Sequence, residues 1–179
     1  TSHFSREEQG AVTAVPMLLR SGGTTQLSPD SINTLLEHYA INVSFGRDGK
    51  SSFSSLNTLT DFLDESLSIW ELLLTQPRFS REMVQVWQNQ ELDYLRRSER
   101  DPNTMAIRTF NQLMFGDHPT GWTLRPEDLE LQHLEPEALR MIHSKIFCQE
   151  NLILGVTGDT TWPDILPKIH KLIASIPPC

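Results

Sequence analysis

The chain of 179 residues has the length of a single domain, and 38% of its residues are hydrophobic, enough to bury one core. Its formal net charge of −8 would repel nucleic-acid phosphates, and its densest basic group, Arg96, Arg97 and Arg100, alternates with acidic residues as on an ion-paired helix face. No apolar run is long enough to span a membrane. We therefore expect one domain, residues 1–179, with no nucleic-acid partner and no membrane span.

The first predicted element is a strongly apolar helix between Glu7 and Arg20, and Pro16 inside it should kink or restart it. Gly22 and Gly23 then end the helix, where residues tolerant of positive φ are favoured. No side chain of this helix can hold a metal or transfer a proton. Its apolar positions recur at helical spacing: Ala11, Val12, Ala14, Val15, Leu18 and Leu19. A helix this apolar must be covered, so we expect it to lie against a sheet at the centre of the domain.

A second helix and a hairpin are predicted next. Ser28 and Pro29 are a strong helix start, and the periodicity continues to Tyr39. The alternating stretch 41–45, the turn 46–49 and the stretch 51–55 then predict two antiparallel strands.

The rest of the chain is predicted to be mostly helical, with one further strand. The apolar run Leu152–Thr157 predicts a strand buried on both faces. Helices are predicted from Thr58 or Thr60 to Leu74, and over 80–99, 101–115, 135–147 and 162–176. The fold class is therefore α+β, a small, mostly antiparallel sheet covered by a layer of helices. Three strands are few for so many helices, so we expect a piece of a longer chain that lacks its first strands.

The sequence contains two cysteines, Cys148 and the last residue, Cys179. They could pair only if the chain end folded back, so we interpret them as free thiols, with Cys148 in the core.

One short string resembles a metal motif. Thr34–His38 differs by one residue from H-x-x-E-H, in which two histidines a turn apart bind zinc and the glutamate activates water. With one histidine replaced by threonine, we interpret the string as an exposed helix face. The six histidines include no pair at i, i+3 or i, i+4 on a helix, and no serine or cysteine has a nucleophile context. The sequence therefore predicts no cofactor and no preformed metal site.

Several stretches of the sequence resemble stretches of the insulinase/pitrilysin (M16) superfamily of zinc peptidases, whose fold is shared with mitochondrial processing peptidase. They are the loop 113–119, the stretch 131–159 and the stretch 10–46, and their order and spacing agree over about Gly10 to Pro177. The resemblance implies a peptidase-like half-domain of α+β class.

The resemblance also implies that the catalytic motif is lost. The family's H-x-x-E-H lies on the first helix, and aligning its Gly-Thr phrase with Gly23 and Thr24 places the motif on Ala14, Met17 and Leu18. A shift of one residue gives Thr13, Pro16 and Met17, and neither register restores a ligand. Glu91 falls near the family's third ligand, a glutamate, as a possible relic. Thr34–His38 follows the Gly-Thr phrase and is not the motif.

The leading hypothesis is thus a catalytically inactive domain that pairs with an active M16-type peptidase domain or subunit and helps to enclose a peptide substrate. The alternative is a structural or assembly module of the same fold that handles no peptide. An active metallopeptidase would need ligands from outside the motif. We expect association through the sheet edge or the His118 loop. Short bacterial relatives of this type are often exported, which implies a periplasmic location.

Overall fold

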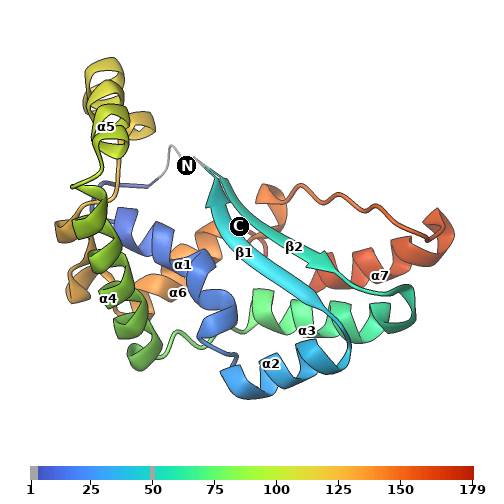
Figure 1. Ribbon diagram of the computed structural model, residues 1–179. Coiled ribbons are helices and arrows are strands. Elements are labelled where there is room, and N and C mark those ends of the chain that lie inside the picture. Colours follow the sequence, from blue (N-terminus) through green and yellow to red (C-terminus); the bar gives the residue numbers. More distant parts are fainter. Residues whose placement is uncertain (1–3, 49–50) are drawn as a thin grey trace.

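The computed structural model describes residues 4–48 and 51–179, which form an α+β domain with a two-stranded antiparallel sheet (Figure 1). His3 and Gly49, the last residue of the predicted turn, lie outside the described residues. The strands are β1 (Asn42–Asp48) and β2 (Ser51–Asn57). The helices are α1 (Gln9–Ser21), α2 (Pro29–His38), α3 (Leu63–Thr75), α4 (Arg81–Ser98), α5 (Pro102–Phe115), α6 (Pro136–Ile146) and α7 (Trp162–Ser175). The predicted fold class is confirmed.

Helix α1 is the centre of the domain, as its apolar sequence predicted. It packs against β1, α4 and α6, and most of its residues are buried. The helix continues through Pro16 as one element. Gly22 caps its C-terminus and Gly23 adopts φ 75°, a conformation that favours glycine. Both glycines therefore end the helix as expected.

Three other helices begin where their capping residues predict. The side chains of Ser28, Ser80 and Asp101 each accept a hydrogen bond from a backbone N–H in the first turn of α2, α4 and α5. Each cap satisfies a donor that has no partner inside its helix. These starts could be predicted because the cap is a local interaction.

The hairpin differs from its predicted register at the turn. Strand β1 continues through Gly46 to Asp48, where a turn was expected, and Gly46 pairs with Phe53. A Cβ atom on Gly46 would meet the Phe53 ring at 2.7 Å, so the glycine lets an aromatic ring cross the neighbouring strand. Gly46 serves this close approach instead of a turn.

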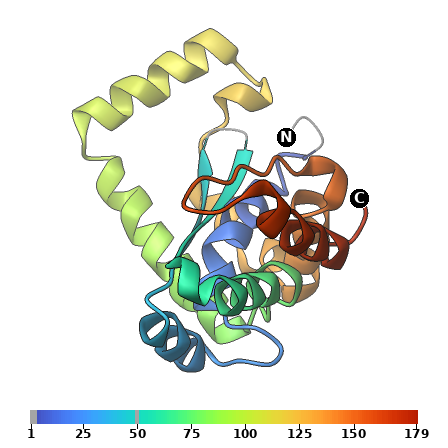
Figure 2. The ribbon, with the colours of Figure 1, turned by 90° about the vertical axis from the view of Figure 1, so that its right-hand side faces the viewer.

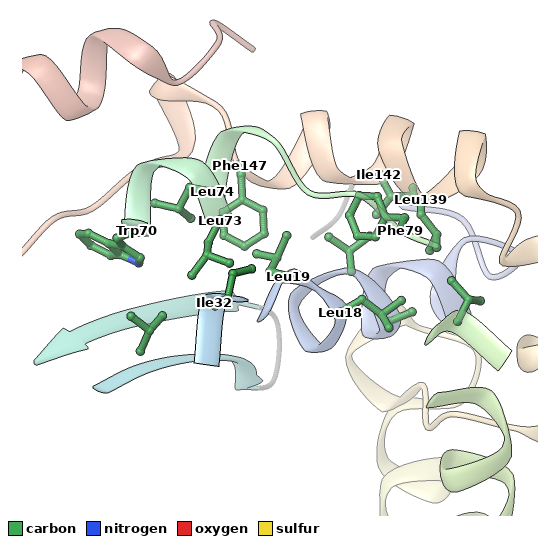
Figure 3. Close-up of a cluster of buried hydrophobic side chains, with 14 of the residues drawn as sticks. Leu18, Leu19, Ile32, Trp70, Leu73, Leu74, Phe79, Leu139, Ile142 and Phe147 are labelled. Atoms are coloured by element: carbon green, nitrogen blue, oxygen red, sulfur yellow. The ribbon is translucent and has the colours of Figure 1, made fainter. Parts of the chain in front are cut away.

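The hydrophobic core lies between the hairpin and the helices α1, α3 and α6 (Figure 3). Leu19 of α1 lies beside Leu73 of α3, and Leu18 belongs to the same cluster together with Leu139 and Ile142 of α6. At its edge the indole N–H of Trp70 donates to the Ser54 hydroxyl over 2.6 Å, which ties α3 to β2. Helix α7 packs beside α3 and extends this layer.

The predicted buried strand at Leu152–Thr157 is wrong. The stretch is extended, but among the described residues it pairs with no strand, and Ile153 is fully exposed. An apolar run becomes a buried strand only where neighbouring strands supply hydrogen bonds and cover. The described residues supply neither.

The interpretation of the cysteines as free thiols is also wrong. Cys148 and Cys179 form a disulfide, because α7 returns the chain end to the start of the 148–161 connection. Gln149 supports this return, since its side-chain amide donates to the carbonyls of Ile173 and Ile176. The disulfide and the Gln149 hydrogen bonds thus hold the end of the chain against the start of the 148–161 connection.

Helix α5 projects away from the body of the domain (Figure 2). None of its residues is buried, and its exposed apolar side chains are Met105, Ile107, Phe110, Leu113, Met114 and Phe115. So many exposed apolar side chains on one helix are typical of an interaction site.

Candidate functional site

The candidate site is the one stripe of α1 that the core does not bury. Along α1 the residues that are not buried are Thr13, Met17, Arg20 and Ser21, spaced as neighbours on one face of a helix. The stripe faces β1 and α2, where a cleft of about 400 Å³ is lined by Pro16, Met17, Arg20, Ser21, Asn33, Val43, Ser44 and Phe45.

The residues at the predicted motif positions occupy different environments. Ala14 and Leu18 are fully buried in the core, whereas Met17 is 43% exposed and lines the cleft. In the alternative register, Thr13 and Met17 both lie on the accessible stripe and Pro16 lines the cleft beside them. Both registers remain predictions, but only the second places both histidine-equivalent positions on the accessible stripe.

Arg20 connects the stripe to both neighbouring elements. Its guanidinium donates to the backbone carbonyl of Val43 in β1 over 3.3 Å and to the side-chain oxygen of Asn33 in α2 over 3.2 Å. Both acceptors are neutral. The Arg20 charge therefore stays uncompensated by any carboxylate among the described residues.

Arg47 flanks the stripe at its other end. Its guanidinium donates to the Thr13 hydroxyl over 3.2 Å, while its buried Nε has no hydrogen-bond partner in the described part of the chain. Burial lowers the pKa of Arg47 from its ordinary value. An arginine in this setting stays charged at neutral pH, so a second cation without a carboxylate partner lies beside α1.

These two arginines were missed by the sequence analysis, although the spacing contained the signal. Arg20 follows Met17 by three residues on a helix, and Arg47 follows Phe45 by two residues on a strand, so each shares a face with a cleft residue. What the sequence could not indicate is that α1 and β1 place both guanidinium groups against one helix stripe.

Glu91 lies apart from the cleft. It is half-buried on α4, which packs against α1, and its carboxylate forms no hydrogen bond or ion pair with the described residues. Burial raises its pKa from the ordinary value of a glutamate. Its role as a relic of a third metal ligand remains a prediction.

The string Thr34–His38 has an ordinary structural explanation. The Thr34 hydroxyl donates to the carbonyl of Asp30 one turn earlier, and His38 is exposed with its ring against Tyr39 at 4.7 Å. A hydroxyl bonded to its own helix and a lone imidazole make no metal site.

The residues present do not fit a catalytic zinc ion. The stripe offers a hydroxyl, a thioether and guanidinium groups, whereas zinc takes imidazole, thiolate and carboxylate ligands. Elsewhere in the described residues, Cys148, Glu150 and Cys179 come together, but the two sulfur atoms are bonded to each other and offer no thiolate.

The chain has the fold of M16 peptidase domains of known structure, and its sequence contains no H-x-x-E-H. No family model matches the chain. A curated protein of similar sequence is the "Non-peptidase homolog YmxG" of Helicobacter pylori, 23% identical over 155 residues, which are 87% of this chain and 36% of that protein.

Solved structures show the same fold. An M16 peptidase inactive domain from Pseudomonas fluorescens superposes with a TM-score of 0.85 at 18% identity, over 97% of this chain and 43% of that one. The periplasmic protease PqqL from Escherichia coli gives a TM-score of 0.78 at 14% identity, over 98% of this chain and 19% of that one. The chain thus spans less than half the length of each of these proteins. Across the part that the structure describes, no helix has the length and apolarity to cross a membrane.

Proposed function

We propose that this domain is the passive half of a peptidase: it pairs with an active M16-type domain or subunit and binds an extended peptide along α1 and β1. The observation that carries the proposal is the α1 stripe, where an accessible cleft is combined with two guanidinium groups that lack carboxylate partners. Arginine donors suit the carbonyl and carboxylate oxygens of a peptide.

The exposed face of α5 supports the existence of a folded partner. Ile107, Phe110 and Met114 recur at i, i+3 and i+7, so they form one apolar strip on a helix that buries none of its own residues. The strip contrasts with an acidic chain of net charge −8, in which 23 acidic residues outnumber 15 basic ones. The proteins of similar fold are more than twice as long as this chain, which is consistent with a second domain.

The test is peptidase activity after co-expression with an M16 peptidase from the same genome that has an intact H-x-x-E-H. We expect cleavage of a quenched fluorescent peptide to exceed that of the active partner alone, and the isolated chain to cleave nothing and to retain no stoichiometric zinc after dialysis. Retention of one zinc per chain would contradict the proposal.

Two variants separate peptide binding from partner binding. Arg47→Gln should raise the KM of the assembled enzyme and leave assembly unchanged, whereas Phe110→Asp should reduce assembly itself. Arg96→Gln, on the exposed face of α4, is the matched control and should change neither. If mixing changes no activity and the partner still binds, the domain is a structural or assembly module.

We further propose a periplasmic location. The disulfide between Cys148 and Cys179 requires an oxidising compartment to persist, and the periplasm is one. Alkylation of cells without reduction, followed by mass spectrometry, should find both cysteines unmodified; two alkylated cysteines would contradict an oxidising location.

A further inference from the structure

Cys148, Glu150 and Cys179 form the one cluster of three potential metal ligands in the described part of the chain. The two sulfur atoms and a Glu150 carboxylate oxygen all lie within 4.8 Å of one another. In the structure the cysteines are joined as a disulfide, which offers no thiolate to a metal ion. Reduction of this bond leaves two thiols beside a carboxylate, and thiolate and carboxylate groups are both ligands of zinc.

The short turn Gln149–Asn151 positions the carboxylate relative to Cys148. The Asn151 backbone N–H donates to the Cys148 carbonyl over 3.1 Å, and the Asn151 side-chain amide donates to the Lys145 carbonyl in α6 over 2.9 Å. Cys148 is buried, whereas Glu150 is exposed. One ligand is therefore fixed in the core, and the second lies beside it at the surface.

Hydrogen bonds hold Cys179 near the turn independently of the disulfide. The Gln149 backbone N–H donates to the Pro177 carbonyl over 3.0 Å, and the Gln149 side-chain amide donates to the Ile176 carbonyl over 2.7 Å. The backbone N–H of Cys179 itself donates to the Glu150 carboxylate over 2.7 Å. Because these bonds do not involve sulfur, we expect both sulfur atoms to stay near the carboxylate when the S–S bond is broken.

We propose that the reduced form of this cluster is a zinc site with Cys148, Glu150 and Cys179 as its ligands. A dithiol reductant transfers two electrons and two protons to the disulfide, which gives two thiols here and a disulfide in the reductant. Zinc then displaces both thiol protons to solvent as the thiolates bind. A tetrahedral zinc ion places two sulfur ligands about 3.8 Å apart, and rotation of the exposed Cys179 side chain supplies this separation.

The ligand set favours zinc and leaves one coordination position open. Two thiolates and one carboxylate carry three negative charges, and thiolate ligands select zinc over the harder calcium and magnesium ions. Glu150 and Cys179 are both exposed, so water has access to the fourth position. The formal net charge of −8 also favours attraction of a cation.

The zinc site is independent of the proposed function, because its residues lie outside the α1 stripe. In an oxidising compartment the disulfide form prevails, so the chain purified without reductant should retain no zinc, as the proposed function also expects. Zinc that binds only after reduction belongs to the cysteine cluster and not to α1. Failure to bind zinc after reduction would refute the zinc site and leave the proposed function intact.

The experiment compares metal binding by the oxidised and the reduced 179-residue chain. The chain is reduced with dithiothreitol, freed of the reductant by anaerobic gel filtration and titrated with Co²⁺, whose thiolate complexes absorb in the near ultraviolet. We expect one Co²⁺ per reduced chain, thiolate-to-metal absorption, displacement by Zn²⁺, and no binding by the oxidised chain. Equal binding by both forms, or no binding by the reduced form, would overturn the proposal.

Variants test the individual ligands. Cys148→Ser should abolish the one-to-one complex, because it removes the buried thiolate. Glu150→Gln keeps an oxygen that can accept the Cys179 N–H bond, so the disulfide should still form on oxidation, while the zinc affinity of the reduced chain should fall at least about tenfold. Glu99→Gln, at the exposed end of α4, is the matched control and should change neither. Unchanged zinc affinity in either ligand variant would overturn the proposal.

Discussion

Helix α1 and the stretch Leu152–Thr157 are both rich in large apolar side chains, yet they lie in opposite environments. Leu18 and Leu19 are fully buried because β1, α4 and α6 surround α1 on all sides but one. Ile153 is fully exposed, since no element of the described chain covers it. A helix satisfies its own backbone and needs only side-chain cover, whereas a strand needs neighbours for both.

The difference shows that an apolar pattern in the sequence indicates which side chains favour burial. Whether they are buried depends on the neighbouring elements that can cover them. Neighbouring elements cover α1 except along the stripe of Thr13, Met17 and Arg20, and this uncovered stripe is the candidate site. Along Leu152–Thr157 the described residues offer too little such surface, and Ile153 stays exposed beside a cleft of about 420 Å³.

The largest expected effect concerns the core around α1. Leu18→Ala should lower the free energy of unfolding by about 2–5 kcal/mol, because it leaves a cavity between α1 and its neighbours. Urea unfolding followed by circular dichroism measures the change. A loss below about 1 kcal/mol would mean that α1 is not the centre of the core.

The disulfide tests how firmly the uncovered region is held. Replacing both Cys148 and Cys179 with serine should lower the free energy of unfolding by about 2–4 kcal/mol, because the bond closes a loop with a sequence separation of 31. Unfolding of the wild type with and without reductant gives the same comparison. The double variant should be insensitive to reductant, and any remaining sensitivity would contradict this account.

A buried histidine adds a pH dependence to the covered region. His143 is buried between Phe79 and Phe147, and burial lowers its pKa although its bond to the Leu74 carbonyl opposes the shift. The unfolded chain therefore takes up a proton before the folded one does. The contribution of His143 is fully present above its ordinary pKa and declines as the pH falls below it, by at most about 1.4 kcal/mol per pH unit.

The measurement is the urea midpoint between pH 5 and pH 7.5 for the wild type and for His143→Gln, which should flatten the slope. Glu91, with a pKa raised by burial, titrates in both proteins, so the difference between the two curves isolates His143. Equal slopes would show that His143 does not carry the effect.

The smallest expected effect concerns the uncovered region. Ile153→Ser should change the free energy of unfolding of the 179-residue chain by less than about 0.5 kcal/mol, because the side chain is fully exposed. Thermal unfolding of the wild type and of the variant tests this statement, and a large loss would contradict the exposure of Ile153.

The sequence by itself determined the helices and most of their ends. The periodicity of α1, the helix starts at Ser28, Ser80 and Asp101 and the stop at Gly22 and Gly23 depend on local interactions, and each was confirmed. It also determined the absence of a catalytic motif, because H-x-x-E-H is a pattern of neighbours on one helix.

Tertiary structure decided what depends on distant residues. It brought Cys179 to Cys148, made Gly46 the place where Phe53 crosses, and put Arg20 and Arg47 against one stripe of α1. It also decided that α1 is covered and Leu152–Thr157 is not. The physical reason is that burial and pairing are properties of two surfaces, and one segment of sequence describes only one of them.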